Sequence, residues 1–156
     1  MKKLVILTSL MLASTLISNA QYKAAFGVRF SDGPAISMKF ATGNNEAAEG
    51  LLSGFGNGLK ATLLYEWHNT AFGTNQWRWY YGAGAHLGAS PDRNWRNDRS
   101  GPDGEFHVGA DGILGLEHTF REIPLNLSID WKPEFNFVNY TGVALPVFGA
   151  TGRLAF

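Results

Sequence analysis

Apolar and polar residues alternate with a period of two along most of the chain, and this pattern strongly limits the possible fold. Successive side chains of a β-strand point to opposite faces of its sheet, so the period indicates strands. Within residues 22–30, for example, the even-numbered positions are all apolar or aromatic, whereas Lys23 and Arg29 lie at odd-numbered positions on the other face. The pattern predicts eight strands, at residues 22–30, 36–40, 47–55, 58–68, 77–87, 106–120, 125–135 and 147–156. The stretch 47–55 is the weakest, and the sequence does not fix its register.

Three further features favour a membrane over water, since soluble antiparallel sheets also alternate. Several predicted strands run about 9 to 12 residues, the length a tilted strand needs to cross the hydrocarbon, whereas soluble strands average about 5 to 6. The polar face carries charges along almost every strand, although a soluble barrel would point its apolar face inward. Aromatic residues gather at the strand ends, as interfacial girdles require. At one end they are Tyr22, Phe40, Trp67, Trp77, Phe120 and Phe156, and at the other Phe30, Phe55, Phe106, Phe135 or Phe137, and Phe148.

The N-terminal segment reads as a secretory signal peptide. Lys2 and Lys3 give a positive start, an apolar stretch follows, and Ser18 and Ala20 form a small-x-small cleavage pattern. The apolar run is shorter than the roughly 20 residues of a membrane-spanning helix. We therefore expect residues 1–20 to be removed and residues 21–156 to form one all-β domain, an eight-stranded antiparallel up-and-down transmembrane β-barrel.

Composition excludes several classes of protein. The chain has 13 basic and 13 acidic residues, and removing Lys2 and Lys3 leaves 11 basic residues against 13 acidic ones. A nucleic-acid-binding domain should be strongly basic, so no nucleic-acid partner is expected. The absence of cysteine excludes disulfides and thiolate metal sites. No cofactor is expected.

Two segments, 111–117 (DGILGLE) and 123–133 (IPLNLSIDWKP), together with the leader and the eight amphipathic strands, resemble small eight-stranded outer-membrane barrels of the OmpA/OmpX type. The resemblance covers the whole expected mature chain and implies a porin-like protein of the Gram-negative cell envelope. It implies outer-membrane lipid and the outer-membrane assembly machinery as partners. Phe156 is similar to the terminal aromatic residue that this machinery recognises. These motifs indicate a barrel and not an activity.

The alternation places seven basic and seven acidic side chains inside the barrel. They could form an ion path, or a self-neutralising plug, since eight strands enclose a space that side chains just fill and buried charges need partners. We favour the plug. The residues are Lys23, Arg29, Lys39, Lys60, Arg78, Lys132 and Arg153, with Glu49, Glu66, Glu105, Asp111, Glu117, Asp130 and Glu134.

His86 and His107 form a candidate polar pair inside the barrel. If the hairpin is symmetric about its long loop, the two histidines lie opposite each other, with Asp111 four residues further along the same face. Two imidazoles and a carboxylate could hold a metal ion, or could act as a histidine with its orienting carboxylate in a hydrolase. The only serine at a matching level is Ser90, so we favour the simpler interpretation of polar interior residues.

A long hydrophilic connection at residues 89–104 is expected on the extracellular side. It carries Trp95 between Arg93 and Arg96, which could contact lipopolysaccharide phosphates or an extracellular partner. A solvated loop with no partner is the simpler alternative.

These observations together favour a non-enzymatic outer-membrane barrel with a structural role or a role in interactions through its loops. Three alternatives stay open: a barrel enzyme that modifies lipid, a narrow channel, and a soluble periplasmic barrel that binds an apolar ligand.

Overall fold

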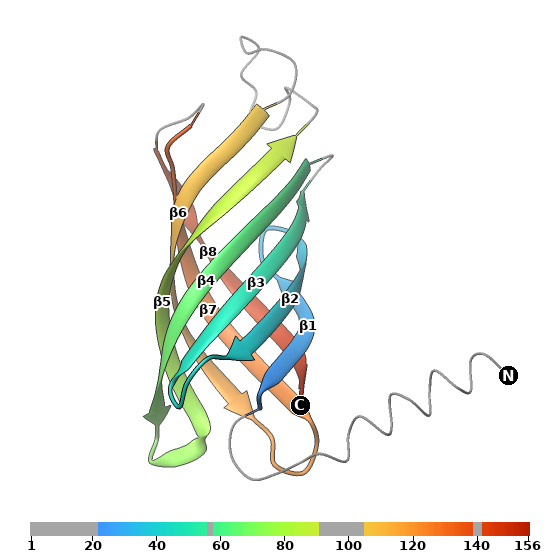
Figure 1. Cartoon of the computed structure of the whole chain (residues 1–156), viewed down its shortest axis with the longest axis vertical. Coiled ribbons are helices and arrows are strands. Elements are labelled where there is room, and N and C mark those ends of the chain that lie inside the picture. The colour runs from blue at the N-terminus through green and yellow to red at the C-terminus, as the bar shows by residue number, and fades with distance from the viewer. Residues whose placement is uncertain (1–21, 56–57, 91–104, 139–141) are drawn as a thin grey trace, which may run out of the picture.

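The computed structural model describes residues 22–55, 58–90, 105–138 and 142–156. They form a closed antiparallel barrel in which every strand pairs with its neighbours in sequence and β8 pairs with β1 (Figure 1). This result confirms the predicted all-β, eight-stranded, up-and-down fold. The strands are β1 (Ala24–Phe30), β2 (Pro34–Ala41), β3 (Glu46–Phe55), β4 (Gly58–Ala71), β5 (Thr74–Ser90), β6 (Glu105–Thr119), β7 (Leu125–Asn136) and β8 (Gly142–Ala155).

In the part of the chain that the structure describes, no helix has the length and apolar character needed to cross a membrane. The expected signal peptide, residues 1–20, lies outside the described residues.

The strands differ from the predicted ones mainly at their ends. The predicted strands 58–68 and 77–87 leave a connection of eight residues between them, but β4 and β5 continue through most of it and leave only Phe72 and Gly73 as the turn. Both residues have positive φ angles, 53° and 66°, as a two-residue hairpin turn requires. Phe72 at such a position gives no sequence signal for a turn, which explains the wrong prediction.

Most of the other changes also lengthen strands, although β1 begins two residues later than predicted. β5 and β6 extend to Ser90 and Glu105, so β5 takes up the first two residues of the predicted connection 89–104. β8 starts five residues earlier than predicted, and its ladder with β7 is irregular between Lys132 and Glu134. Pro133 lies in this irregularity, where a missing N–H costs no regular ladder hydrogen bond. The weak strand pairs fully, from Glu46 opposite Trp67 to Phe55 opposite Gly58.

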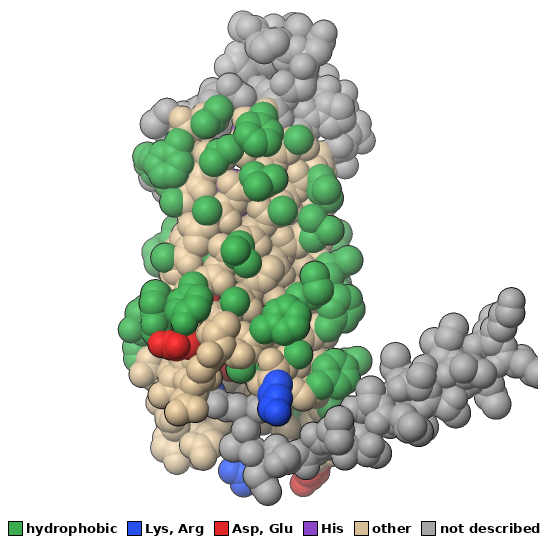
Figure 2. Space-filling view, in the orientation of Figure 1, with side chains coloured by type: hydrophobic (Ala, Val, Ile, Leu, Met, Phe, Trp, Pro, Cys, Tyr) green, Lys and Arg blue, Asp and Glu red, His purple; other side chains and the backbone are tan. Residues whose placement is uncertain are grey.

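The barrel turns its apolar face outward. Large apolar side chains on alternate positions of the strands are exposed, including Leu63 (66%), Ile129 (63%) and Phe148 (77%). Figure 2 shows hydrophobic side chains over much of the visible face of the barrel, with the charged ones near its lower end. Near that end Tyr65, Trp67, Tyr81 and Trp79 form a row of ring contacts across β4 and β5, with centroid distances of 5.2, 5.7 and 5.5 Å.

The opposite face holds buried polar and charged side chains, and glycines make space for the largest of them. A Cβ atom on Gly115 would lie 2.4 Å from the Tyr80 ring, and one on Gly149 would lie 2.3 Å from the Arg29 guanidinium. Tyr80 and Gly115 are direct cross-strand partners, so the ring covers the glycine. Close packing of the interior thus explains part of the high glycine content of the strands.

Candidate functional site

The start of β1 and the end of β8 lie at the lower end of the barrel in Figure 1. The interior toward this end holds a group of buried ionisable side chains that we call the lower cluster. Lys39 Nζ lies 2.7 Å from Glu66 Oε2, 3.4 Å from Glu49 Oε2 and 3.7 Å from Glu117 Oε2. Its members, all at most 3% exposed, are Lys39, Glu49, Glu66, His68, Glu117 and Arg153.

Arg153 is the most highly coordinated member of the lower cluster. It forms an ion pair with Glu49 and donates to Ser37 Oγ at 2.7 Å. On its other side it donates to Asn126 Oδ1 at 3.2 Å and to Ser128 Oγ at 2.8 Å. One guanidinium therefore joins β8 to β2, β3 and β7 through side chains, and its fixed fork of five donors suits this task.

A second group, the upper cluster, lies toward the other end of the interior. It consists of Lys60, His86, Asp111, Lys132 and Glu134. Lys132 Nζ lies 2.8 Å from Asp111 Oδ1 and also pairs with Glu134, and Lys60 Nζ lies 2.8 Å from Glu134 Oε1. Both carboxylates therefore have an ammonium partner.

An apolar layer separates the two clusters along the strands. Leu64 lies between Lys60 and Glu66 on β4, and Ile113 lies between Asp111 and Glu117 on β6. The layer is a contiguous cluster of Leu51, Leu64, Tyr80 and Ile113. Beside it, Arg29 of β1 pairs with Asp130 of β7 as a separate buried ion pair, and Arg29 Nη1 donates to Ser31 Oγ at 3.0 Å.

The structure thus brings together most of the charges that alternation placed inside, with two exceptions at the lower rim. Lys23 is exposed, because it precedes β1 and does not follow the strand's alternation. Arg78 is half-buried and donates to Asn45 Oδ1 at 2.9 Å, instead of pairing within either cluster. The side chain of Glu105 lies outside the described residues.

The predicted opposition of His86 and His107 is wrong by two residues. His86 pairs with Gly109, and His107 pairs with Gly88. A two-residue shift keeps every side chain on its face, so alternation cannot detect it. His86 instead contacts Asp111, with 2.7 Å between Nδ1 and Oδ2, and Asn136, with 2.8 Å between Nε2 and Oδ1.

A set of potential metal ligands exists in the upper cluster, but it differs from the predicted one. His86, Asp111 and Glu134 offer ligand atoms within 4.8 Å of one another, with Glu134 in the place expected for His107. The two carboxylates are already bound by Lys132 and Lys60. A metal ion would have to displace these ammonium groups, so the arrangement suits a salt-bridge network better than a metal centre.

Two interior residues were not singled out from the sequence. His68 lies between Glu66 and Glu117, with 3.1 Å from Nε2 to Glu66 Oε2 and 3.1 Å from Nδ1 to Glu117 Oε1. Its ring stacks on Tyr80 at 5.2 Å between centroids. Both residues lie on the polar face of their strands, and this phase was the signal that could have identified them.

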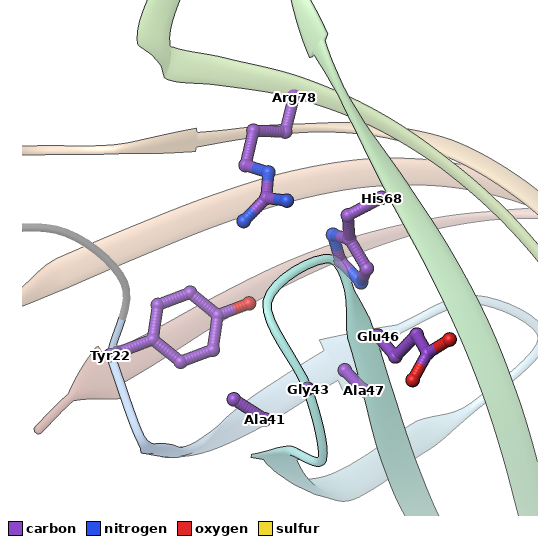
Figure 3. Close-up of a pocket in the computed structure, with 7 residues that line it drawn as sticks. All are labelled: Tyr22, Ala41, Gly43, Glu46, Ala47, His68 and Arg78. Carbon is purple, nitrogen blue, oxygen red and sulfur yellow. The ribbon is translucent and has the colours of Figure 1, made fainter.

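Tyr22 also differs from its expected position on the outward face. It precedes β1, and its hydroxyl donates to Glu117 Oε2 at 3.1 Å. Burial, followed by the negative charge of Glu117, raises the pKa of the Tyr22 hydroxyl well above its usual range, so the group stays a donor. Together with His68 and Arg78 it lines a pocket at the lower end of the barrel (Figure 3).

The candidate loop residues Arg93, Trp95 and Arg96 lie outside the described residues, as does the side chain of Ser90. Phe156 is described: its backbone accepts hydrogen bonds from Lys23 N at 2.6 Å and Ala24 N at 3.1 Å and so helps to join β8 to β1.

Comparisons with known proteins support the fold. No family model and no curated protein sequence matches the chain. Among solved structures, the crystal structure of the N-terminal β-barrel domain of Pseudomonas aeruginosa OprF superposes with a TM-score of 0.65. The match has 14% sequence identity and covers 88% of this chain and 100% of the OprF domain chain. The chain therefore shares the closed eight-stranded barrel fold of the OprF domain, and this is the fold that the sequence resemblance predicted.

Proposed function

We propose that this protein is an integral barrel of the Gram-negative outer membrane, exported by the leader at residues 1–20, with a closed interior and a structural or loop-mediated role. The observation that carries the proposal is the inverted polarity of the barrel. Large apolar side chains cover its outside, and charged side chains fill its inside. A barrel folded in water would bury its apolar side chains and expose its charged ones. Lipid around the barrel and ion pairs within it stabilise the arrangement that is observed.

Lipid is the partner that fits the outer surface. Exposed large apolar side chains occur on all eight strands and recur along most of them, which would be a severe aggregation liability in water. The row of Tyr65, Trp67, Tyr81 and Trp79 supports an interfacial position near the lower end, because aromatic rings favour the headgroup level.

Pairing of the interior charges supports a plug over an ion path. The two clusters and the Arg29–Asp130 pair join strands across the interior, with an apolar layer between the clusters. An ion in transit would have to break these pairs and cross the apolar layer, and both steps oppose conduction.

The remaining alternatives receive less support. An apolar ligand would need an apolar interior, whereas this interior is largely charged. A lipid-modifying enzyme would need its base beside lipid, whereas His86 and Asp111 are 3% and 4% exposed and paired with each other.

The proposal also includes contacts that residues of the outer loop and the C-terminal residue would make with partners. Arg93, Trp95 and Arg96 would present a loop to lipopolysaccharide phosphates or an extracellular partner. Phe156, with 48% of its surface exposed, would be read by the assembly machinery.

Fractionation and heat-modifiability test the proposed location. We expect the protein in the outer-membrane pellet, and we expect unboiled and boiled samples to migrate differently on a gel because a closed barrel resists the detergent. Recovery in the soluble periplasmic fraction without a mobility shift would contradict the proposal. Planar bilayers test the plug: purified protein should give no steady conductance steps, and reproducible single-channel steps would favour the narrow channel.

A further inference from the structure

Both ring nitrogens of His68 contact carboxylate oxygens, and this geometry determines its hydrogen-bonding requirements. Nδ1 faces Glu117 and Nε2 faces Glu66, each at 3.1 Å. A carboxylate only accepts hydrogen bonds, and a neutral imidazole has one N–H and one lone pair. A neutral His68 would therefore point a lone pair at one carboxylate. Only the imidazolium donates to both.

The charges of the lower cluster lead to the same conclusion. Lys39 and Arg153 supply two positive charges, and Glu49, Glu66 and Glu117 supply three negative ones when all three are ionised. A net charge in a buried site is costly, so a third cation is favoured there. An imidazolium at His68 balances the cluster without any further group.

The upper cluster provides an internal comparison. Lys60 and Lys132 already balance Asp111 and Glu134. Among the described residues, the hydrogen-bond partners of the His86 ring are one carboxylate, that of Asp111, and the Asn136 amide. An amide offers both donors and an acceptor, so a neutral His86 can satisfy both contacts. The two histidines therefore differ in the number of protons that their partners require.

A pocket connects His68 to the lower end of the barrel. It is lined by Tyr22, Ala41, Gly43, Glu46, Ala47, His68 and Arg78 (Figure 3). The ionisable groups around His68 come from most of the barrel wall: Tyr22, Lys39 of β2, Glu46 and Glu49 of β3, Glu66 of β4, Arg78 and Tyr80 of β5, Glu117 of β6 and Arg153 of β8.

We propose that His68 is a proton-binding site at the lower end of the barrel. Glu66 and Glu117 hold the protonated ring, and this imidazolium is the third cation of the lower cluster. The proton enters and leaves through the pocket that His68 lines. This proposal is separate from the proposed membrane role, because it is argued only from side-chain contacts inside the folded barrel. Loss of the proton at high pH would leave one carboxylate facing a lone pair and would weaken the cluster.

Nuclear magnetic resonance of the folded full chain, with ¹⁵N-labelled histidine in detergent micelles, tests the proposal. The chain has four histidines, and the variants His68→Gln and His86→Gln assign two of them. An unperturbed histidine titrates near pH 6.5 and is mostly neutral at pH 8. At pH 8 we expect both nitrogens of His68 to carry protons and His86 to carry one. A neutral tautomer of His68 at pH 8 would overturn the proposal.

A substitution of one of the two carboxylates, Glu66 and Glu117, tests whether this two-carboxylate clamp, and not burial alone, sets the protonation of His68. In Glu117→Gln an amide can donate to Nδ1, so His68 should become neutral at pH 8. The control Glu134→Gln, in the upper cluster, should leave the ring-nitrogen signals of His68 unchanged. An imidazolium that persists in folded Glu117→Gln protein would contradict the two-carboxylate clamp. If Glu117→Gln does not fold, the wild-type spectrum still decides. A heat-modifiable barrel with neutral His68 would refute this inference and leave the proposed function intact.

Discussion

Arg153 of β8 and Glu49 of β3 form a buried ion pair between two strands that share no backbone hydrogen bonds. β1 and β2 separate these strands in the barrel wall, so the pair links them through the interior. The exposed fraction of each residue is 1%. Removal of one partner would leave the other charge buried, and this penalty makes the pair a sensitive probe of the closed interior.

The variant Arg153→Met should be strongly destabilised. Glu49 would keep only Ser37 at 2.6 Å and the more distant Lys39 at 3.4 Å. Breaking a buried ion pair from one side costs about 3–5 kcal/mol in the free energy of unfolding. Urea unfolding of the refolded protein in lipid vesicles measures this loss.

The double variant Arg153→Met/Glu49→Gln controls for side-chain loss alone. Its cost should be well below the sum of the two single costs, because neither charge is left without its partner. Strictly additive costs would show that the two side chains do not act as a pair.

Gly115→Ala should destabilise the barrel because the new methyl group meets the Tyr80 ring. The added Cβ would lie 2.4 Å from Tyr80 Cζ, and the ring is fully buried. Overpacking of this kind costs about 1–3 kcal/mol. The additional change Tyr80→Leu should recover part of the loss, as measured by the same urea unfolding.

Gly54→Ala is the matched control for that experiment. No atom lies within 4 Å of a Cβ built at Gly54, so its effect should stay within about 0.5 kcal/mol. Equal losses in the two alanine variants would rule out the packing of Tyr80 on Gly115 as the cause.

The β4–β5 turn gives a prediction that depends on backbone conformation alone. Gly73 has a φ of 66°, and a Cβ there would meet no atom within 4 Å. Gly73→Ala should therefore lose about 1–2 kcal/mol through left-handed strain and not through a clash. Gly73→Asn should lose less, because asparagine tolerates this conformation better. A Gly73→Ala variant as stable as Gly54→Ala would refute the two-residue turn.

The sequence predicted the features that depend on period two. The strand number follows from where the alternation starts and stops, and the inward phase of Arg29, Lys39 and Asp111 depends on which face each residue occupies. Alternation reports this face directly, even in the weak strand 47–55.

Features that depend on register or on strand ends could not be predicted. His86 is two positions away from the expected level, and such a shift leaves the face pattern unchanged. Lys23 and Tyr22 precede β1, so the alternation does not govern their side chains. The position of His68 between two carboxylates depends on a contact between β4 and β6, which are not adjacent in the barrel, and no local pattern encodes that contact.

Spin-label accessibility tests the central claim, that lipid surrounds the apolar outer face of this barrel. Because the sequence contains no cysteine, single nitroxide labels can be placed at Leu63→Cys and Ile129→Cys, with Glu122→Cys in the β6–β7 turn as control. In lipid vesicles we expect the first two labels to collide readily with oxygen and rarely with a polar nickel chelate, and the control to show the reverse. Free access of the nickel chelate to the labels at Leu63 and Ile129 in folded protein would contradict the account.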